Sequence, residues 1–116
     1  MRYHWSAEEV RSRRQRNVEK VISSLRSYDP QKIILFGSHA RGDDDRYSDL
    51  DLVVIKETDE RFLDRLETIY DLVQPDFALD VLVYTSQELA DMRDRGSAFA
   101  EKVLEEGVVV YERPGE

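Results

Sequence analysis

A glycine–serine pair that ends one apolar segment, followed at a fixed distance by paired aspartates that open a second, constrains this chain more than any other feature. Gly37 and Ser38 follow the apolar run 32–36, and after a spacer of ten residues Asp49 and Asp51 stand at the start of the next apolar run. Both runs are rich in aliphatic, β-branched residues, which is typical of strands in a buried sheet. The pattern predicts two strands, with a turn at the end of one and acidic side chains at the mouth of the other.

Capping residues and hydrophobic spacing predict the other elements, with capping boxes at Ser6–Glu9 and at Thr85–Glu88. The first elements expected are a helix after the capping box Ser6–Glu9, ended by Asp29-Pro30, a strand at 32–36, a helical turn from Ser38 or Ala40, and a strand at 50–56. A helix capped by Thr58 or Asp59 follows, and its apolar stripe is Phe62, Leu63, Leu66, Ile69, Tyr70 and Val73. The chain then continues with a strand at 77–84, helices at 86–96 and 97–106, and a strand at 108–111. This order predicts an α/β (α+β) fold, with a small sheet covered by helices.

Length and composition set the class of protein. The chain has 116 residues, with 41% apolar and 36% charged residues, so we expect one globular domain over residues 1–116. No apolar run reaches the roughly 20 residues that a membrane helix needs. Cysteine is absent, and the two histidines, His4 and His39, are too far apart in the sequence to suggest a zinc site. A reducing cytoplasm is therefore the expected compartment.

Charge is unevenly distributed along the chain. Residues 1–26 carry seven Lys/Arg and three Glu, while the rest carries ten Lys/Arg and 22 Asp/Glu, for a net charge of −8. This balance argues against a protein whose main task is to grip a nucleic-acid backbone. The basic run Arg11–Arg16 is interpreted as a solvated helix face or an arm on the acidic body, and residues 1–16 as the half of the helix that projects. The specific role of this run stays open.

Three acidic side chains are the candidate metal ligands and catalytic groups. Asp49 and Asp51 are two apart, so on a strand they project from one face, roughly 6.6 Å apart. Asp80 interrupts the apolar run 77–84, where a carboxylate is costly unless it is paired or binds a metal. If the third strand lies beside the second, the three carboxylates converge. Such oxygen donors suit Mg²⁺, and two ions about 3.5–4 Å apart would clamp the attacking and leaving oxygens of an in-line displacement.

A phosphate site is predicted beside these acids. Gly37 allows close approach to the backbone, and the amides that follow, with the Ser38 hydroxyl, can hold phosphates at a helix N-terminus. Arg41 adds a charged phosphate contact. Asp80 is the expected acceptor of the nucleophile's proton. His39 is expected to point to solvent without a specific role.

Each of these elements also has a plain structural interpretation when it is taken alone. Asp43 and Asp45 repeat the Asp-x-Asp spacing by accident, a Gly-Ser pair is often only a turn, and Asp80 could be a salt-bridged core residue. Two other phosphate-binding motifs fail. Asp43-Asp44 stands where a Walker A loop requires Lys-Ser/Thr, and Ser38-His39 breaks the Gly-x-Gly-x-x-Gly pattern.

The combined pattern resembles the minimal nucleotidyltransferases of the DNA polymerase β superfamily: Gly37-Ser38, ten residues, Asp49-x-Asp51, and Asp80 in an apolar strand. The likeness runs from about residue 18 to residue 112 and includes a short helix, an acidic-glycine turn and a valine-rich strand. It implies a small mixed sheet with helices packed mainly on one face, Mg²⁺ and a nucleoside triphosphate donor. It also implies that the three aspartates bind metal and that Gly37 and Ser38 contact the triphosphate.

The resemblance further implies a reaction. Members of this size look like antitoxins that silence a helical HEPN-domain toxin, a ribonuclease, by transferring AMP from ATP to a toxin tyrosine. We therefore expect a Mg²⁺-dependent protein adenylyltransferase. The alternatives are a small-molecule acceptor, such as an aminoglycoside bound between two subunits, a toxin-binding module without catalysis, and a nucleic-acid-binding protein that uses Arg11–Arg16. The acceptor, the number of AMP groups, the preferred base and the oligomeric state, homo- or hetero-oligomer, stay open.

Overall fold

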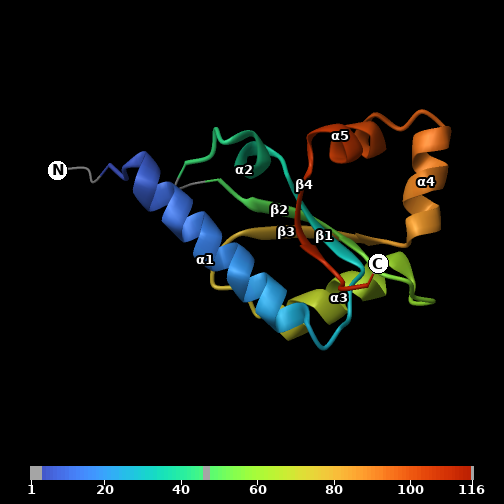
Figure 1. The fold of residues 1–116 in the computed structure, drawn as a ribbon. Coiled ribbons are helices and arrows are strands. Elements are labelled where there is room, and N and C mark those ends of the chain that lie inside the picture. Colours follow the sequence, from blue (N-terminus) through green and yellow to red (C-terminus); the bar gives the residue numbers. More distant parts are fainter. Residues whose placement is uncertain (1–3, 46–47, 116) are drawn as a thin grey trace.

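The structure is a computed structural model that describes residues 4–45 and 48–115. Its elements, in chain order, are α1 (Ala7–Leu25), β1 (Lys32–Phe36), α2 (Ser38–Arg41), β2 (Leu50–Ile55), α3 (Phe62–Val73), β3 (Leu79–Tyr84), α4 (Ser86–Asp94), α5 (Ala98–Glu106) and β4 (Val108–Glu112). The strands form one four-stranded sheet in the order β3-β2-β1-β4 (Figure 1). β2 is parallel to β3, and β1 is antiparallel to β2 and β4. The predicted α/β class is confirmed, and the third strand lies beside the second, which is the condition for the three acids to converge.

Each face of the sheet carries its own buried cluster, because successive strand residues point to opposite sides. On one face α1 and α3 supply Val21 and Ile69, which belong to the same cluster as Leu52 of β2. On the other face α4 and α5 supply Leu89 and Val103 to a smaller cluster. Most of the core therefore lies under α1 and α3, in line with the expected packing mainly on one face, while α4 and α5 form a second, smaller layer.

Two helices begin at the capping boxes that the sequence predicts. The Ser6 hydroxyl accepts a hydrogen bond from the Glu9 amide at 3.1 Å, and the Glu9 carboxylate accepts one from the Ser6 amide at 3.0 Å. Thr85 and Glu88 make the same reciprocal pair at the start of α4. Each box satisfies two amides that the first turn of a helix would otherwise leave without partners.

α3 begins later than the sequence predicts. The Thr58 hydroxyl accepts a hydrogen bond from the Glu60 amide at 3.1 Å, and the helix starts at Phe62 after Arg61. The predicted cap at Thr58 or Asp59 is therefore wrong. Thr58 closes a turn that precedes the helix instead of capping its first turn.

The face of α3 that packs on the sheet matches the predicted stripe at Ile69 and Val73 and differs from it at Leu63 and Tyr70. Its buried residues are Arg65, Ile69 and Val73. Leu63, expected on the apolar stripe, is 74% exposed, and Tyr70 is partly exposed. The Arg65 guanidinium is accommodated because it donates to the Glu88 carboxylate at 2.6 Å and to two backbone carbonyls. A fully hydrogen-bonded arginine thus takes a position that hydrophobic spacing assigns to aliphatic residues.

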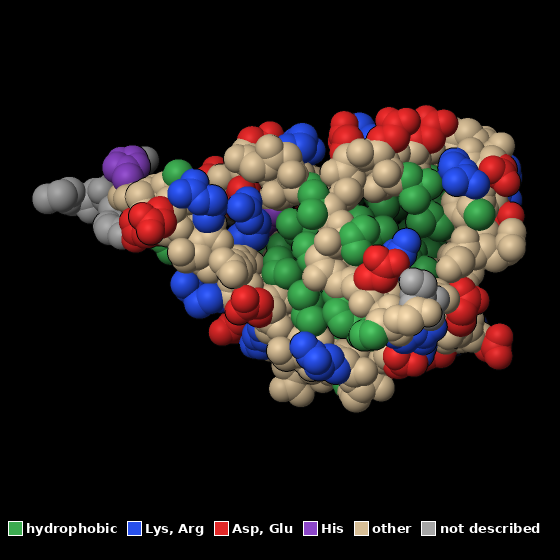
Figure 2. Space-filling model, viewed as in Figure 1, with side chains coloured by type: hydrophobic (Ala, Val, Ile, Leu, Met, Phe, Trp, Pro, Cys, Tyr) green, Lys and Arg blue, Asp and Glu red, His purple; other side chains and the backbone are tan. Residues whose placement is uncertain are grey.

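The first half of α1 extends past the sheet, and the described residues span 50 × 31 × 28 Å. Figure 2 shows basic side chains gathered along this part of the helix, at the left of the view. Arg11 and Arg16 are exposed, whereas Arg14 is half-buried against the loop that follows α2. Within the described part of the chain, no helix is long and apolar enough to cross a membrane.

Candidate functional site

Gly37 connects β1 to the single helical turn of α2 and packs against β2. Its backbone has φ 75° and ψ −153°, a combination that essentially only glycine adopts. A Cβ atom on this residue would collide with Oδ2 of Asp51. Glycine is therefore required here twice, once by the backbone conformation and once by the side chain beside it. The structure brings the predicted phosphate-binding turn and a predicted metal-binding carboxylate into direct contact.

Asp51 and Asp80 are lateral neighbours on the parallel strands β2 and β3. Their side chains point to the same face of the sheet, the one that α4 and α5 partly cover, and their carboxyl groups share a hydrogen bond. The expectation that Asp80 is buried is wrong: β3 is an edge strand, and Asp80 is exposed near its first residue. The apolar residues of β3 that suggested burial, such as Val81, face the opposite side, beneath α3.

The pKa of Asp51 is raised from 3.8 to about 6. Burial is the largest cause, followed by the charges of Asp80 and Asp49 and the hydrogen bond with Asp80, while the Arg41 charge acts in the opposite direction. Asp49 is exposed, immediately before β2. The structure therefore places three predicted acids and Arg41 within electrostatic range of one another, around the partly buried carboxyl group of Asp51.

The three carboxylates are chemically suited to bind a divalent cation, although they are not already arranged as a complete coordination site. Among residues 4–45 and 48–115, no group of three acidic, histidine or cysteine side chains is already gathered in metal-binding geometry. The raised pKa of Asp51 favours a proton on this carboxyl group beside the charges of Asp80 and Asp49. A bound cation would replace that proton, because its charge also offsets the repulsion between the neighbouring carboxylates. The oxygen donors are those that Mg²⁺ prefers.

Arg41 and Ser38 remain at the surface near these acids. Ser38 is the first residue of α2, and its backbone carbonyl accepts hydrogen bonds from the amides of Gly42 and Asp43, which close the turn. The Arg41 side chain is half exposed and its Nε donates to Asp43 at 3.2 Å. An exposed guanidinium held only by a surface carboxylate can swing toward a bound phosphate at little cost. Its phosphate contact stays a prediction.

The expectation that His39 points to solvent is wrong. His39 is only 8% exposed, and its Nε2 lies 3.6 Å from Oδ2 of Asp44. Burial lowers the pKa of His39, with the Arg14 charge acting in the same direction and the Asp44 charge against it. Sequence reasoning missed this cluster because its members lie 5 and 25 residues from His39 and share no recognisable spacing.

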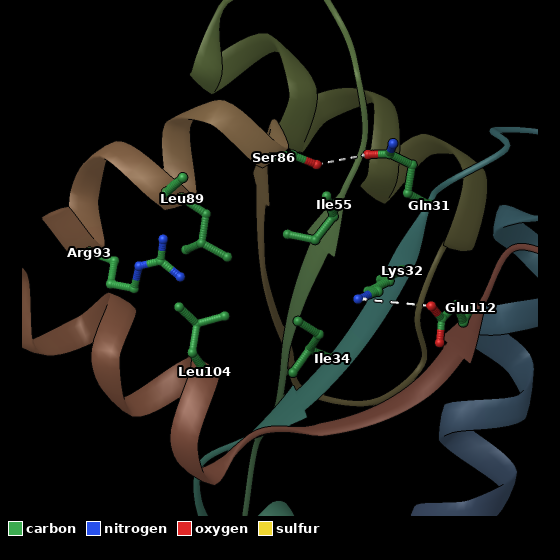
Figure 3. Close-up of a pocket in the computed structure, with 10 residues that line it drawn as sticks. Gln31, Lys32, Ile34, Ile55, Ser86, Leu89, Arg93, Leu104 and Glu112 are labelled. Carbon is green, nitrogen blue, oxygen red and sulfur yellow. Dashed lines mark hydrogen bonds and ion pairs between the residues drawn. The ribbon is translucent and has the colours of Figure 1, made fainter. Parts of the chain in front are cut away.

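A separate cavity of about 370 Å³ opens on the same face of the sheet, between α4, α5 and β1 (Figure 3). Its apolar walls are Ile34, Ile55, Leu89 and Leu104. Arg93 reaches toward it from α4, and the ion pair between Lys32 and Glu112 borders it. Ile55 lies four residues along β2 from Asp51, roughly 13 Å at strand spacing. The cavity is thus distinct from the carboxylates.

Comparison with known proteins places this site in a family. Residues 19–116 match the family model described as polymerase beta, nucleotidyltransferase. A candidate protein adenylyltransferase of Methanocaldococcus jannaschii is 38% identical over 81 residues, which cover 70% of this chain and 78% of that protein.

Two solved structures share the fold. A candidate nucleotidyltransferase from Sulfolobus solfataricus superposes with a TM-score of 0.69 at 21% identity, covering 97% of this chain and 93% of that one. A chain of a toxin–antitoxin structure with AMP-PNP superposes with a TM-score of 0.57 at 23% identity, covering 84% of this chain and 75% of that one. The family match spans both the Gly37 turn and the three acids. The chain belongs to the polymerase beta nucleotidyltransferase family.

Proposed function

We propose that this protein is a Mg²⁺-dependent adenylyltransferase that moves AMP from ATP to a hydroxyl group of a partner protein. One observation carries the proposal: Asp51 packs on Gly37 and pairs with Asp80, so that acids suited to a cation adjoin a turn suited to phosphate. Membership of a nucleotidyltransferase family supports the transfer chemistry. A cytoplasmic location, where ATP and Mg²⁺ are at hand, is part of the proposal.

The residues have separate roles in this proposal. The backbone around Gly37 and the Ser38 hydroxyl bind the β- and γ-phosphates, and Arg41 turns from Asp43 to contact them. Asp49, Asp51 and Asp80 would hold Mg²⁺, as two ions. When bound, these ions neutralise the charge that develops on the attacking and leaving oxygens.

The reaction is a single in-line displacement. The acceptor hydroxyl oxygen forms a bond to the α-phosphorus, the bond from that phosphorus to the oxygen bridging to the β-phosphate breaks, and pyrophosphate leaves. Asp80 accepts the proton of the hydroxyl group. Its exposure at an edge strand supports this role, because a base must be reached by an acceptor that arrives from outside.

A protein acceptor is supported by the M. jannaschii relative, whose name assigns it protein adenylyltransferase activity. A helical HEPN-type toxin, modified on a tyrosine, is the acceptor that we propose. The fold shared with a chain of a toxin–antitoxin structure is compatible with such a partner. The exposed position of Asp49 and Asp80 leaves room for a second protein to approach the acids.

The proposal is tested by incubating the protein with α-labelled ATP, Mg²⁺ and a helical HEPN-type protein, which is first sought in the neighbouring reading frame. Label is expected on a tyrosine of that partner with the native protein, and none with Asp49→Asn or Asp51→Asn. Asp94→Asn, which changes an exposed acid of α4 outside the site, serves as the control and should label normally. Full neutralisation of the toxin by the Asp51→Asn variant would show a binding module without catalysis. Labelling of an added aminoglycoside but not of the protein would show a small-molecule acceptor.

A further inference from the structure

One arginine of the basic run in α1 is bound to the loop that follows the phosphate-binding turn. Nη1 of Arg14 donates to Oδ1 of Asp44 at 2.8 Å and to the backbone carbonyl of His39 at 3.2 Å. The Asp44 side chain is 3% exposed and that of Arg14 is 21% exposed. Such a charge-assisted contact, largely removed from water, is worth considerably more than a surface ion pair.

The segment held by Arg14 connects the two halves of the proposed site. α2 is only four residues long, and Asp44 lies between it and Asp49. A helix this short has few internal hydrogen bonds, so its position depends on contacts from outside. By binding the carbonyl of His39 and the side chain of Asp44, Arg14 supplies such contacts at two points of this connection.

His39 extends the same cluster toward the acids. Its ring is buried next to Asp44, and the backbone of Asp49 is among the influences on its pKa. Among the described residues, Oδ2 of Asp44 has no hydrogen-bond partner, so the charge of this carboxylate is balanced mainly by Arg14. Removal of Arg14 would leave a buried carboxylate uncompensated, which would drive Asp44 toward water and the loop with it.

We propose that Arg14 is a positioning residue for the nucleotide site, acting through Asp44 and His39 to hold the connection between the Gly37 turn and Asp49. The inference rests on the proposed function. It separates Arg14 from its neighbours on the helix: Arg16 is exposed, whereas Arg14 is part of the support of the site. It also makes α1 a route by which a ligand or partner bound to this helix alters nucleotide binding.

The test measures the dissociation constant of the full-length protein for ATP–Mg²⁺ by calorimetry, with the melting temperature recorded for each variant. Arg14→Ala is expected to weaken binding about tenfold or more, and Arg14→Lys, which keeps the positive charge, should recover part of the lost affinity. Arg16→Ala is the matched control and should bind within about twofold of the native protein. Adding Asp44→Asn to Arg14→Ala removes the uncompensated charge and should restore at least part of the lost affinity.

The outcomes distinguish this inference from the proposed function. A normal dissociation constant for Arg14→Ala together with a lower melting temperature would show a purely structural role and overturn the inference, as would the absence of any rescue by Asp44→Asn. If the native protein itself does not bind ATP–Mg²⁺, the proposed function fails. In that case hydrogen exchange still tests the positioning role: Arg14→Ala, but not Arg16→Ala, should speed exchange of the amides in residues 37–45.

Discussion

Gly37 packs so closely against the carboxylate of Asp51 that no side chain fits between them. Gly37, which leaves β1, and Asp51, the second residue of β2, are therefore packed in direct contact, although 13 residues separate them in the sequence. The proximity explains why the motif needs a glycine at this exact position. It also means that a displacement of the turn would move the carboxylate, so the proposed phosphate and metal sites are mechanically linked.

Replacing Gly37 with alanine should impair both stability and binding. The new Cβ would collide with Oδ2 of Asp51 and would also occupy a backbone conformation that costs an L-residue about 1–3 kcal/mol. Gly96→Ala is the matched control, since Gly96 also has a positive φ, 81°, but has open space where a Cβ would go. Urea unfolding should show a larger loss for Gly37→Ala than for Gly96→Ala, and calorimetry should show lost ATP–Mg²⁺ binding only for Gly37→Ala. Equal losses in stability and unchanged binding would contradict the close packing.

The raised pKa of Asp51 predicts how stability depends on pH in the metal-free protein. Because the folded-state pKa, about 6, exceeds the ordinary 3.8, the native state binds more protons than the unfolded state between these values. The contribution of Asp51 to stability therefore falls as pH rises through this window and stays low above it. Asp51→Asn removes the effect and should make the metal-free protein about 1 kcal/mol more stable near pH 7.5, a value reduced for partial solvent screening. Urea unfolding of both proteins from acid to neutral pH provides the check, and a variant less stable than the native protein at neutral pH would refute it.

The pair formed by Arg65 and Glu88 predicts a pH dependence of stability opposite to that of Asp51, with stability lost as pH falls. The hydrogen bond from Arg65 holds the pKa of Glu88 below its usual value, so its stabilising contribution is present above about pH 4.5 and is lost as pH falls through the folded-state pKa. Arg65→Met should cost about 2–4 kcal/mol, because the buried guanidinium also bonds two backbone carbonyls. Arg61→Met, which changes an arginine whose side chain is 87% exposed, should cost less than about 0.5 kcal/mol. Chemical denaturation across acid pH measures both. If the difference in free energy of unfolding between the native protein and Glu88→Gln stayed constant down to the lowest pH, the effect would be ruled out.

The sequence predicted the strands, the capping boxes of α1 and α4, and the meeting of Asp51 with the Gly37 turn, because each rests on local spacing or on one strand adjacency. It predicted the burial of Ile69 and Val73 on α3, but not that of Arg65. Arg65 occupies that face because the Glu88 carboxylate and two backbone carbonyls satisfy its guanidinium, and two of these three partners lie 18 and 23 residues away in the chain. The burial of a charged residue at an apolar position can be predicted only when the groups that pair with it are known.

The same limit applies to the site. The apolar setting of Asp80 predicted a buried acid, yet the apolar residues of an edge strand line one face only, and Asp80 lies on the other. The position of Asp80 beside Asp51 agrees with the prediction, although the burial on which that prediction rested is wrong. His39 and Arg14 show the converse, since their contact with Asp44 depends on how α1 crosses the loop after α2. No periodicity of the sequence encodes that crossing.

Cation binding should depend on pH in the direction set by Asp51. The carboxyl group must lose its proton before it can bind a metal, so the apparent dissociation constant should rise about tenfold per pH unit below about 6 and level off above it. Mn²⁺, which takes the same oxygen ligands as Mg²⁺, allows the free ion to be followed by electron paramagnetic resonance. Binding near pH 5 should release close to one proton, and binding near pH 8 almost none. Asp94→Asn should reproduce the native profile, whereas Asp51→Asn should bind more weakly with little dependence on pH. Equal affinity of the native protein at both pH values would show that the metal does not replace the proton that Asp51 shares with Asp80.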